Sequence, residues 1–538
     1  MIKTNLLLKS ICCLFFCGVM AWNPLMAQQQ ATPEGIQFTR QAVRRFLFDK
    51  ELSIPLSALH PNEIIGMPVM YPTAHRLADH ATIQTTGHRL SLQSEKKSTT
   101  AIWFGGFNPF ATYTIELDSC KGNGEIGFEF SDEDQKNQCI ITAVFDDQNM
   151  VDARVRIVKD SITIIEKSIS IKAGETNKIQ GKIILQMLGS GLVLYVQNND
   201  LPKPVAQCET SEYLDLRKTA FIHSFQSRLF LTLEKGRVDI EKIDASLSSG
   251  TGLADIRAIT YENGDPLLDK GRLWYTMTIR GRGLPHPMQG VFSMSPSVFD
   301  IRMEGVIVFD RQDGLLRNEV ASHIFYDRKD SVWRGLTTGF SAFANKTEKK
   351  QLLTIESKQD PRFGFSIMRA TPFGMVGDYE DPHILFDAKA KKWRMLTCTN
   401  ENGYKAIMLE SDVWNKGYTK IAGPVANNST GTSIQKIGNQ FYCFSGSKDR
   451  KIYIYTYPDL KEAGTLKMDL PPWDETSGSR VWPNVVQLPE GYPFRYVALM
   501  MDRFNYPGLE SPNWTYGALY LYHGYNQLAK ELNQNAKN

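Results

Sequence analysis

Two stretches of similar sequence decide the fold of this 538-residue chain. They are Ser322-His-Ile-Phe-Tyr-Asp-Arg-Lys-Asp-Ser-Val-Trp-Arg-Gly-Leu336 and Pro382-His-Ile-Leu-Phe-Asp-Ala-Lys-Ala-Lys-Lys-Trp-Arg-Met-Leu396, and seven of the paired positions carry the same residue. Each stretch has an apolar run, a short polar turn and a second run that contains a tryptophan, the pattern of two antiparallel strands. One such unit cannot bury both of its faces, so its repetition predicts an array of β-units that pack side by side.

Three further segments follow the same template of strand, turn and strand. The first begins at Asp255 and resumes after its turn at Gly271, the second is the hairpin from Thr432 to Phe444, and the third begins at Asn484. The units follow one another at intervals of roughly 50 to 65 residues, within the range of known β-repeats. Five such units predict a five-bladed β-propeller over residues 250–528.

Residues 28–249 have a different pattern, with many short runs in which apolar and polar residues alternate. The predicted strands lie at 112–117, 125–130, 140–145, 155–158, 162–165, 182–187 and 191–197. Turn residues separate several of them, as in Lys-Gly-Asn-Gly at 121–124 and Asp-Asp-Gln-Asn at 146–149. This predicts a β-sandwich of the jelly-roll type, joined to the propeller by a hinge at 250–252. The predicted fold class is therefore all-β throughout.

Residues 1–27 have the composition of a secretory signal peptide. Two lysines flank an apolar run at 11–22, and small or polar residues follow. Twelve apolar residues are fewer than the roughly 20 that span a bilayer, and no later segment is long enough. The sequence therefore predicts a secreted or periplasmic protein without a membrane span, while Cys17 leaves open a lipoprotein at the cell surface. Residues 529–538 are predicted to form a disordered tail.

Composition excludes several classes of partner. Removal of the two lysines in the signal peptide from the 61 basic residues leaves 59, against 58 acidic ones, which gives no electrostatic reason to bind nucleic acid. No phosphate-binding loop, dinucleotide fingerprint, His-Glu-x-x-His helix or nucleophile elbow is present. Five cysteines remain in the mature chain. Two interpretations of these cysteines stay open: a disulfide between Cys120 and Cys139, or a set of buried free thiols.

The segment Asp-Pro-His-Ile-Leu-Phe-Asp at 381–387, followed by Lys-Trp-Arg-Met at 392–395, resembles the blade-opening motif of five-bladed propeller glycosidases. That group includes arabinanases, xylosidases and invertases, and the resemblance covers about residues 250–525. The strand rhythm at 124–130, 155–158 and 185–196 resembles the laminin-G and concanavalin-like jelly rolls that accompany secreted glycosidases.

The resemblance implies a catalytic site at the mouth of the propeller, where two carboxyl groups flank the glycosidic bond. It implies that Asp255 is the base or nucleophile, that Asp381 holds the sugar and tunes the acid, and that Glu380 is an acid or a substrate ligand. The sequence departs from the family pattern in blade four, which opens at Gly431 instead of a glutamate, and in blade two, which opens without an aspartate. The acid must then come from one of four glutamates, at positions 380, 304, 319 or 475.

Basic, aromatic and amide residues near the blade starts are candidates for substrate binding. They are Arg257, Arg280, His286, His323, His383, Arg480, Trp482 and Asn484. Arginine forks bind carboxylates in a bidentate manner, which suggests a uronate-containing glycan. Histidines are common acid and base groups and common metal ligands. No cofactor is predicted, although a structural calcium ion at the propeller centre is open.

These observations favour a secreted glycoside hydrolase that acts on a complex polysaccharide or oligosaccharide. Two alternatives stay open: a non-catalytic glycan-binding protein of the same fold, and a polysaccharide lyase that works through histidine and arginine. The missing glutamate of blade four favours the binding protein. The sugar, the linkage, the stereochemical outcome and the oligomeric state do not follow from the sequence.

Overall fold

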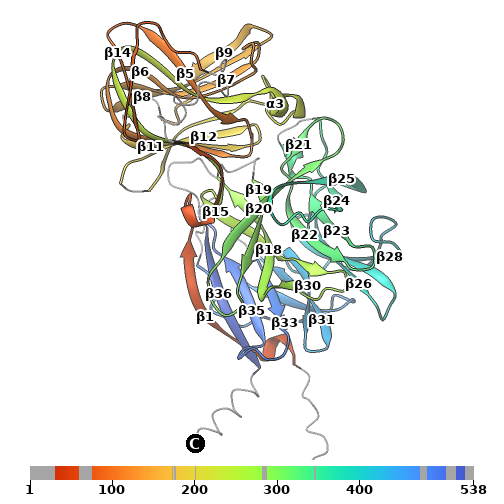
Figure 1. Ribbon diagram of the computed structural model, residues 1–538. Helices are drawn as coiled ribbons and strands as arrows, with labels where there is room; N and C mark the ends of the chain where they lie inside the picture. Colours follow the sequence, from red (N-terminus) through yellow and green to blue (C-terminus); the bar gives the residue numbers. More distant parts are fainter. Residues whose placement is uncertain are drawn as a thin grey trace, which may run out of the picture.

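The computed structural model describes residues 31–59, 75–172, 174, 177–199, 201–281, 287–343, 347–472, 482–504 and 517–526. Over these residues the chain forms a β-sandwich followed by a five-bladed β-propeller (Figure 1). The predicted signal peptide and C-terminal tail lie outside the described residues. Among the helices in the described ranges, none has the length and apolar character needed to cross a membrane.

Each blade of the propeller is a sheet of four antiparallel strands, and the first strand of each blade lies innermost. Blade 1 contains β15 (Gly252–Ala258), β18 (Arg272–Arg280), β19 (Met288–Met294) and β20 (Arg302–Asp310), and blade 2 contains β22 (Val320–Asp327), β23 (Val332–Thr338), β24 (Gln351–Ser357) and β25 (Gly364–Val376). Blade 3 contains β26 (Tyr379–Asp387), β27 (Lys392–Asn400), β28 (Tyr404–Ser411) and β29 (Thr419–Ala422), and blade 4 contains β30 (Thr430–Ile437), β31 (Gln440–Gly446), β32 (Ile452–Thr456) and β33 (Glu462–Thr465). Blade 5 contains β34 (Val485–Gln487), β35 (Tyr496–Met501), β36 (Ala518–Asn526) and β1 (Ile36–Arg45). The short strands β16 (Thr260–Tyr261), β17 (Leu268–Asp269) and β21 (Leu316–Arg317) extend blades 1 and 2. The five-unit repeat predicted from the sequence is therefore confirmed.

The outermost strand of blade 5 comes from the N-terminal end of the chain. β1 pairs antiparallel with β36, from Ile36 opposite Asn526 to Arg45 opposite Ala518 (Figure 1, red beside blue). We expected this segment within an N-terminal domain of residues 28–249, and that expectation was wrong. Alternation of apolar and polar residues predicts a strand but not its partner, and β36 without β1 would present an unpaired edge.

Apolar side chains between neighbouring blades form the propeller core. Trp333 lies in the cluster between blades 1 and 2, together with Ile259 and Leu353, and Trp393 lies in the cluster between blades 2 and 3. Both tryptophans of the repeat are buried. Each sheet therefore hides its faces against the next sheet, which is the physical reason why a single unit would not be stable alone.

The sandwich is built on two long strands that run through both of its layers. Its strands are β2 (Ser53–Leu59), β3 (Thr82–Thr86), β4 (Arg89–Ser94), β5 (Ser98–Gly106), β6 (Thr112–Ser131), β7 (Gln138–Asp146), β8 (Asn149–Lys159), β9 (Ile162–Ser168), β10 (Asn177–Lys178), β11 (Gly181–Leu188), β12 (Gly191–Gln197), β13 (Lys203–Glu209) and β14 (Gln226–Ser248). β6 and β14 pair along nearly their whole length, and different neighbours flank their two halves.

One predicted turn of the sandwich is absent. The segment 121–124 lies inside β6, where Gly122 faces Gly236 of β14, and a Cβ on Gly122 would lie 2.1 Å from the carbonyl oxygen of Lys235. Glycine therefore permits a close approach of two long strands here and does not end a strand. The second predicted turn, at 146–149, is the β7–β8 hairpin, as expected.

The five described cysteines are buried free thiols, so no disulfide joins Cys120 and Cys139. Burial raises the pKa of both thiols. They behave as small apolar residues of the sandwich core, where both lie in the same cluster.

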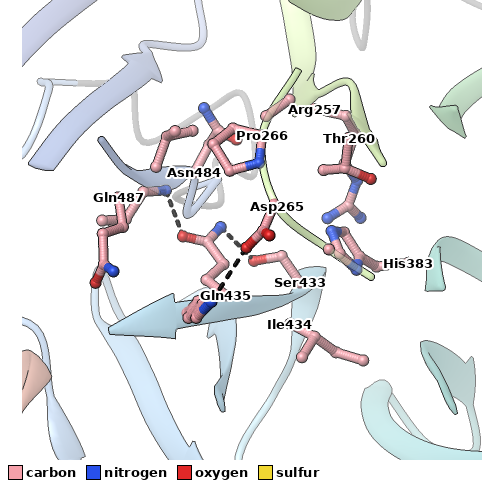
Figure 2. A pocket seen from close by; sticks show the side chains of 15 residues that line it. Arg257, Thr260, Asp265, Pro266, His383, Ser433, Ile434, Gln435, Asn484 and Gln487 are labelled. Atoms are coloured by element: carbon pink, nitrogen blue, oxygen red, sulfur yellow. Dashed lines mark hydrogen bonds and ion pairs between the residues drawn. The ribbon is translucent and has the colours of Figure 1, made fainter. Parts of the chain in front are cut away.

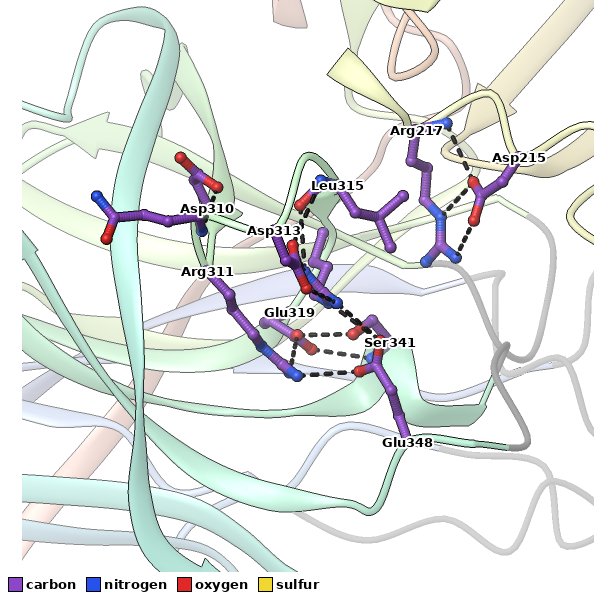
Figure 3. A network of polar contacts seen from close by, with 11 residues as sticks. Asp215, Arg217, Asp310, Arg311, Asp313, Leu315, Glu319, Ser341 and Glu348 are labelled. Atoms are coloured by element: carbon purple, nitrogen blue, oxygen red, sulfur yellow. Dashed lines mark hydrogen bonds and ion pairs between the residues drawn. The ribbon is translucent and has the colours of Figure 1, made fainter. Parts of the chain in front are cut away.

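The sandwich contacts the propeller at several places within the described residues, of which two lie near blade 1. The backbone N–H of Leu316 donates to the carbonyl of Arg217 at 3.0 Å, just before the short helix α3 (Thr219–Ser224). Close by lies a network of ion pairs, in which Arg317 contacts Asp313 at 2.6 Å and Glu348 at 2.9 Å (Figure 3). At the second place, the hydroxyl of Tyr195 lies 3.5 Å from the carbonyl of Gly281, one residue beyond the end of β18. The sandwich therefore borders blade 1 at the end where the inner strand begins.

Candidate active site at the propeller mouth

The inner strands of blades 1 to 4 share a β-bulge near the end at which they begin, which is called the mouth below. The residues that occupy the bulge have a positive φ: 51° at Asp255, 55° at Ala321, 58° at Asp381 and 61° at Gly431. The pairing of each inner strand with its neighbour shifts at this point. The four residues are therefore equivalent, and the two aspartates expected at equivalent blade starts do lie there.

Asp255 forms ion pairs with two arginines. A guanidinium N–H of Arg280, the last residue of β18, donates to Oδ2 at 3.2 Å, and Nη2 of Arg503 lies 3.6 Å from Oδ1. Asp255 is 5% exposed, so this carboxylate is largely shielded from water. The sequence analysis named Arg280 but missed Arg503, which follows the second strand of blade 5 much as Arg280 ends the second strand of blade 1.

Asp381 is held by the start of blade 4. Its Oδ2 accepts hydrogen bonds from the backbone N–H of Gly431 at 2.6 Å and from the hydroxyl of Thr430 at 2.9 Å. Its carbonyl accepts from the hydroxyl of Thr432 at 2.7 Å and from Arg257 at 3.0 Å. The carboxylate therefore joins two blades at the mouth.

The absence of a side chain at Gly431 has a steric cause. A Cβ at this position would lie 2.8 Å from ring atoms of Trp482, closer than real Cβ atoms approach other heavy atoms. Trp482 is buried, and its indole N–H donates to the carbonyl of Ile256 at 2.6 Å. Trp482 is thus part of the core between blades 5 and 1, and its burial argues against the substrate-binding role for which the sequence made it a candidate.

Glu380 lies in a separate polar cluster beside Asp381. It contacts the ammonium group of Lys350 and accepts a hydrogen bond from the hydroxyl of Tyr404 at 2.6 Å, and the same two groups bind Asp378. Burial, with the nearby charge of Asp381, raises the pKa of Glu380. Burial acts in the same direction on Asp378, but the hydrogen bonds from Lys350 and from an asparagine outweigh it and lower the pKa of Asp378. Glu380 therefore takes up a proton more readily than Asp378.

The other glutamates proposed as acids are less suitable. Glu319 is fully buried and accepts hydrogen bonds from Arg311 at 2.8 Å and from the hydroxyl of Ser341 at 2.7 Å (Figure 3). Glu304 is bonded to Ser293, at the end of blade 1 opposite the mouth. Glu475 lies outside the described residues, as do His286 and Arg480.

The residues two positions after the four bulges, together with the residue just before the inner strand of blade 5, form a second layer within the channel. In chain order they are Arg257, His323, His383, Ser433 and Asn484. The imidazole rings of His323 and His383 stack with centroids 3.8 Å apart. All five residues are buried. The sequence correctly grouped four of them, but the structure places them inside the propeller and below the mouth.

His323 cannot act as the base of a lyase. Its Nδ1 accepts the backbone N–H of Ile384 at 3.2 Å, so its proton resides on Nε2, which lies 3.2 Å from the hydroxyl of Thr260. Burial and the charge of Arg257 lower the pKa of His323 to about 3 and also lower the pKa of His383. Both rings are therefore neutral at physiological pH, and the expectation of an acid–base histidine at position 323 was wrong.

A cavity of about 60 Å³ lies along the channel below the mouth, lined by every residue of the second layer except His323 and by Thr260, Asp265 and Gln435, among others (Figure 2). Its residues do not fit a central calcium ion, which requires several oxygen ligands. Arg257 brings a positive charge to the wall of the cavity, and the one carboxylate of the lining, Asp265, is paired with Lys436 at 3.2 Å. Among the described residues there is also no group of three histidine, cysteine or acidic side chains that would hold a metal ion.

Comparison with known proteins gives a likeness of architecture only. No family model matches the chain, and no curated protein matches it in sequence. Among solved structures, an α-L-arabinofuranosidase from Podospora anserina is similar at 9% identity over 52% of this chain and 92% of its own, with a TM-score of 0.35. A GH43_1 enzyme from Xanthomonas citri is similar at 11% identity over 51% of this chain and 89% of its own, with a TM-score of 0.36.

The carbohydrate binding module CBM66 from Bacillus subtilis is also similar, at 14% identity over 31% of this chain and 94% of the module, with a TM-score of 0.20. The chain thus resembles five-bladed propeller glycosidases and a β-sandwich module, as its sequence pattern suggested. All of these TM-scores lie below 0.5. Nothing about the chemistry of this chain follows from the likeness.

Proposed function

We propose that the protein is a secreted carbohydrate-active enzyme that hydrolyses glycosidic bonds at the propeller mouth. The observation that carries this proposal is the presence of two carboxyl groups in different electrostatic environments near the same opening. Asp255 is ion-paired with two arginines, whereas Glu380 is half-buried, contacts one lysine and has a raised pKa. Glycosidases separate the roles of their carboxyl groups in this way, one ionised and one protonated.

In this mechanism Asp255 activates water or attacks the anomeric carbon, and Glu380 donates a proton to the leaving oxygen. Asp381 is a positioning residue. Its charge contributes to the raised pKa of Glu380, and its hydrogen bonds fix the start of blade 4. Lys350 and Tyr404 orient the carboxyl of Glu380.

The test is release of reducing sugar from neutral pentose polysaccharides and from uronate-containing polysaccharides by the mature chain. Asp255→Asn and Glu380→Gln are each expected to lower kcat by at least about 100-fold with little change in glycan binding, because acid–base groups contribute about that much or more. Glu380→Gln should also remove the alkaline limb of the pH–rate profile. Glu304→Gln is the matched control, since Glu304 lies at the opposite end of blade 1.

A glycan-binding protein is the second candidate, and Gly431 favours it, because blade four supplies no carboxyl group at its bulge. Glycan binding without release of sugar from any polysaccharide, unchanged by Asp255→Asn, would replace the hydrolase proposal with this one. Uronate recognition has weaker support, because Arg280 is already paired with Asp255 and Arg257 is turned into the channel. Preference for the uronate substrates in the same assay would restore it.

A further inference from the structure

We propose that the central cavity of the propeller binds a small monovalent anion of the halide class. This inference concerns the second layer of the channel and does not depend on whether the mouth is catalytic. It begins with Arg257, which is 1% exposed and lies on the inner strand of blade 1. A guanidinium group has five N–H donors and no acceptor, so a buried arginine needs several acceptors around it.

The described protein groups around Arg257 satisfy only part of this need. Its Nη2 donates to the carbonyl of Asp381, and its plane lies over the ring of Trp482, with 4.8 Å from the guanidinium carbon to the ring centroid. Nε and Nη1 are buried and have no hydrogen-bond partner in the described part of the chain. Leaving such donors unpaired is unfavourable, and more so for a charged group.

The carboxylates nearest to Arg257 are bonded to other groups. Asp381 directs its Oδ2 to blade 4, and Asp255 is paired with Arg280 and Arg503. The negative charges of Asp381 and Asp255 favour a higher pKa of Arg257 from a distance. Burial outweighs them and lowers this pKa to about 10. The side chain is therefore cationic at neutral pH and has no acceptor of opposite charge in direct contact.

A second donor lines the same cavity. The Nδ2 group of Asn484 is buried without a hydrogen-bond partner among the described residues, and so is Nδ1 of His383. Asn484 lies across the cavity from His383 and Thr260 (Figure 2). Unsatisfied N–H groups of Arg257 and Asn484 that border one partly open cavity form a site for an acceptor, and the positive charge selects an anion over water.

The size of the cavity sets the class of ligand. Its volume of about 60 Å³ is several times the roughly 10–15 Å³ that one water-sized particle requires. A chloride or bromide ion therefore fits this space. Asp265, the acidic residue of the lining, is neutralised by Lys436 and hydrogen-bonded to Asn263 at 2.8 Å.

The test uses the full mature chain and bromide as the probe. The thermal unfolding midpoint is measured against sodium bromide and, at equal ionic strength, against sodium methanesulfonate, whose anion is bulkier. We expect bromide alone to raise the midpoint, by about 2 °C or more at tenfold above its Kd. Crystals in bromide should show an anomalous peak in the cavity, in contact with Arg257 and Asn484. Equal responses to both salts, with no peak in the cavity, would overturn the proposal.

Asn484→Asp provides an internal replacement for the anion, because it adds a fixed carboxylate to the cavity wall. This variant should keep the fold and lose the bromide-specific shift. Asn198→Asp makes the same change at an exposed position of the sandwich and should keep the full shift. A bromide response that is identical in both variants would contradict the assignment to this cavity. If Asn484→Asp does not fold, the salt comparison and the anomalous peak decide the question with the unmodified chain.

Discussion

The two layers of the propeller channel use charge in opposite ways. In the bulge layer, Asp255 and Asp381 have partners from neighbouring strands for their carboxylates. In the second layer, Arg257 and Asn484 keep buried donors without partners in the described chain. Blades 1 to 4 share the bulge, so the difference between Asp255, Asp381 and the other two bulge residues arises from side chains. The repeat determines the backbone positions of the two layers. The individual side chains determine which charged groups have protein partners and which have donors free for a ligand.

The largest expected effect is that of Asp381→Ala, which removes the acceptor for Gly431 and Thr430 and the negative charge beside Arg257. The two buried donors left without an acceptor cost about 1–3 kcal/mol each, together about 2–6 kcal/mol. We expect the free energy of unfolding, from urea denaturation, to fall by about that amount. Asp381→Asn should cost less, because its amide oxygen still accepts a hydrogen bond. Equal and small losses in both variants would mean that the bulge layer does not depend on this carboxylate.

Asp255→Ala should destabilise the protein by about 2–4 kcal/mol, because it leaves Arg280 and Arg503 beside each other without their shared carboxylate. The double variant Asp255→Ala with Arg280→Met should recover part of this loss. Urea denaturation of the four proteins in the cycle measures the coupling between the two residues. Additive losses would show that the ion pair contributes no coupling energy.

The second layer predicts a loss of stability in acid. The pKa of His323 is lowered to about 3 in the folded state, against an ordinary value of 6.5, so the unfolded chain binds more protons between these values. The contribution of such a histidine to the free energy of unfolding is therefore fully present above pH 6.5. Below pH 6.5 the free energy of unfolding falls by about 1.4 kcal/mol per pH unit for each such histidine. Urea denaturation at pH 7, 5.5 and 4 measures the slope. His323→Gln should reduce it, whereas His88→Gln, at an exposed position, should not.

The smallest expected effect concerns Ala321, which adopts the left-handed backbone of the bulge with no side-chain compensation. Relief of strain of about 1–2 kcal/mol should slightly outweigh the entropy that glycine adds to the unfolded chain, about 0.5–1 kcal/mol. Ala321→Gly is thus expected to be neutral or to stabilise by up to about 1 kcal/mol. Ala258→Gly, on an inner strand outside the left-handed region, should destabilise. Equal destabilisation by both changes would argue against strain at the bulge.

Much of the propeller could be predicted because its repeats are local in sequence. Strand, turn and tryptophan recur within fifteen residues in blades 2 and 3, and the inner strands begin where the motif begins. The partner of β1 could not be predicted, because strand alternation carries no information on which distant edge it will cover. The long strands β6 and β14 were missed for a related reason: glycines that permit close contact look the same in sequence as glycines that make a turn.

The candidate site was predicted at the level of position but not of environment. Equivalent starts of the blades placed Asp255 and Asp381 correctly at the mouth, and grouped Arg257 with the histidines. Whether a residue two positions further on faces a substrate or the channel depends on the packing of five sheets. That packing also explains Gly431, since the space of a side chain there is filled by Trp482, more than fifty residues away in sequence.

The pairing of β1 with β36 imposes an order on biosynthesis. The strand that completes blade 5 leaves the ribosome before the sandwich and the other strands of the propeller, and its partner emerges only after them. The propeller therefore cannot close until β36 has been synthesised, and the early strand must stay unpaired until then. A shortened protein that begins at residue 250 would contain every predicted blade motif and still have an open edge in blade 5, with the aggregation risk of an unpaired strand.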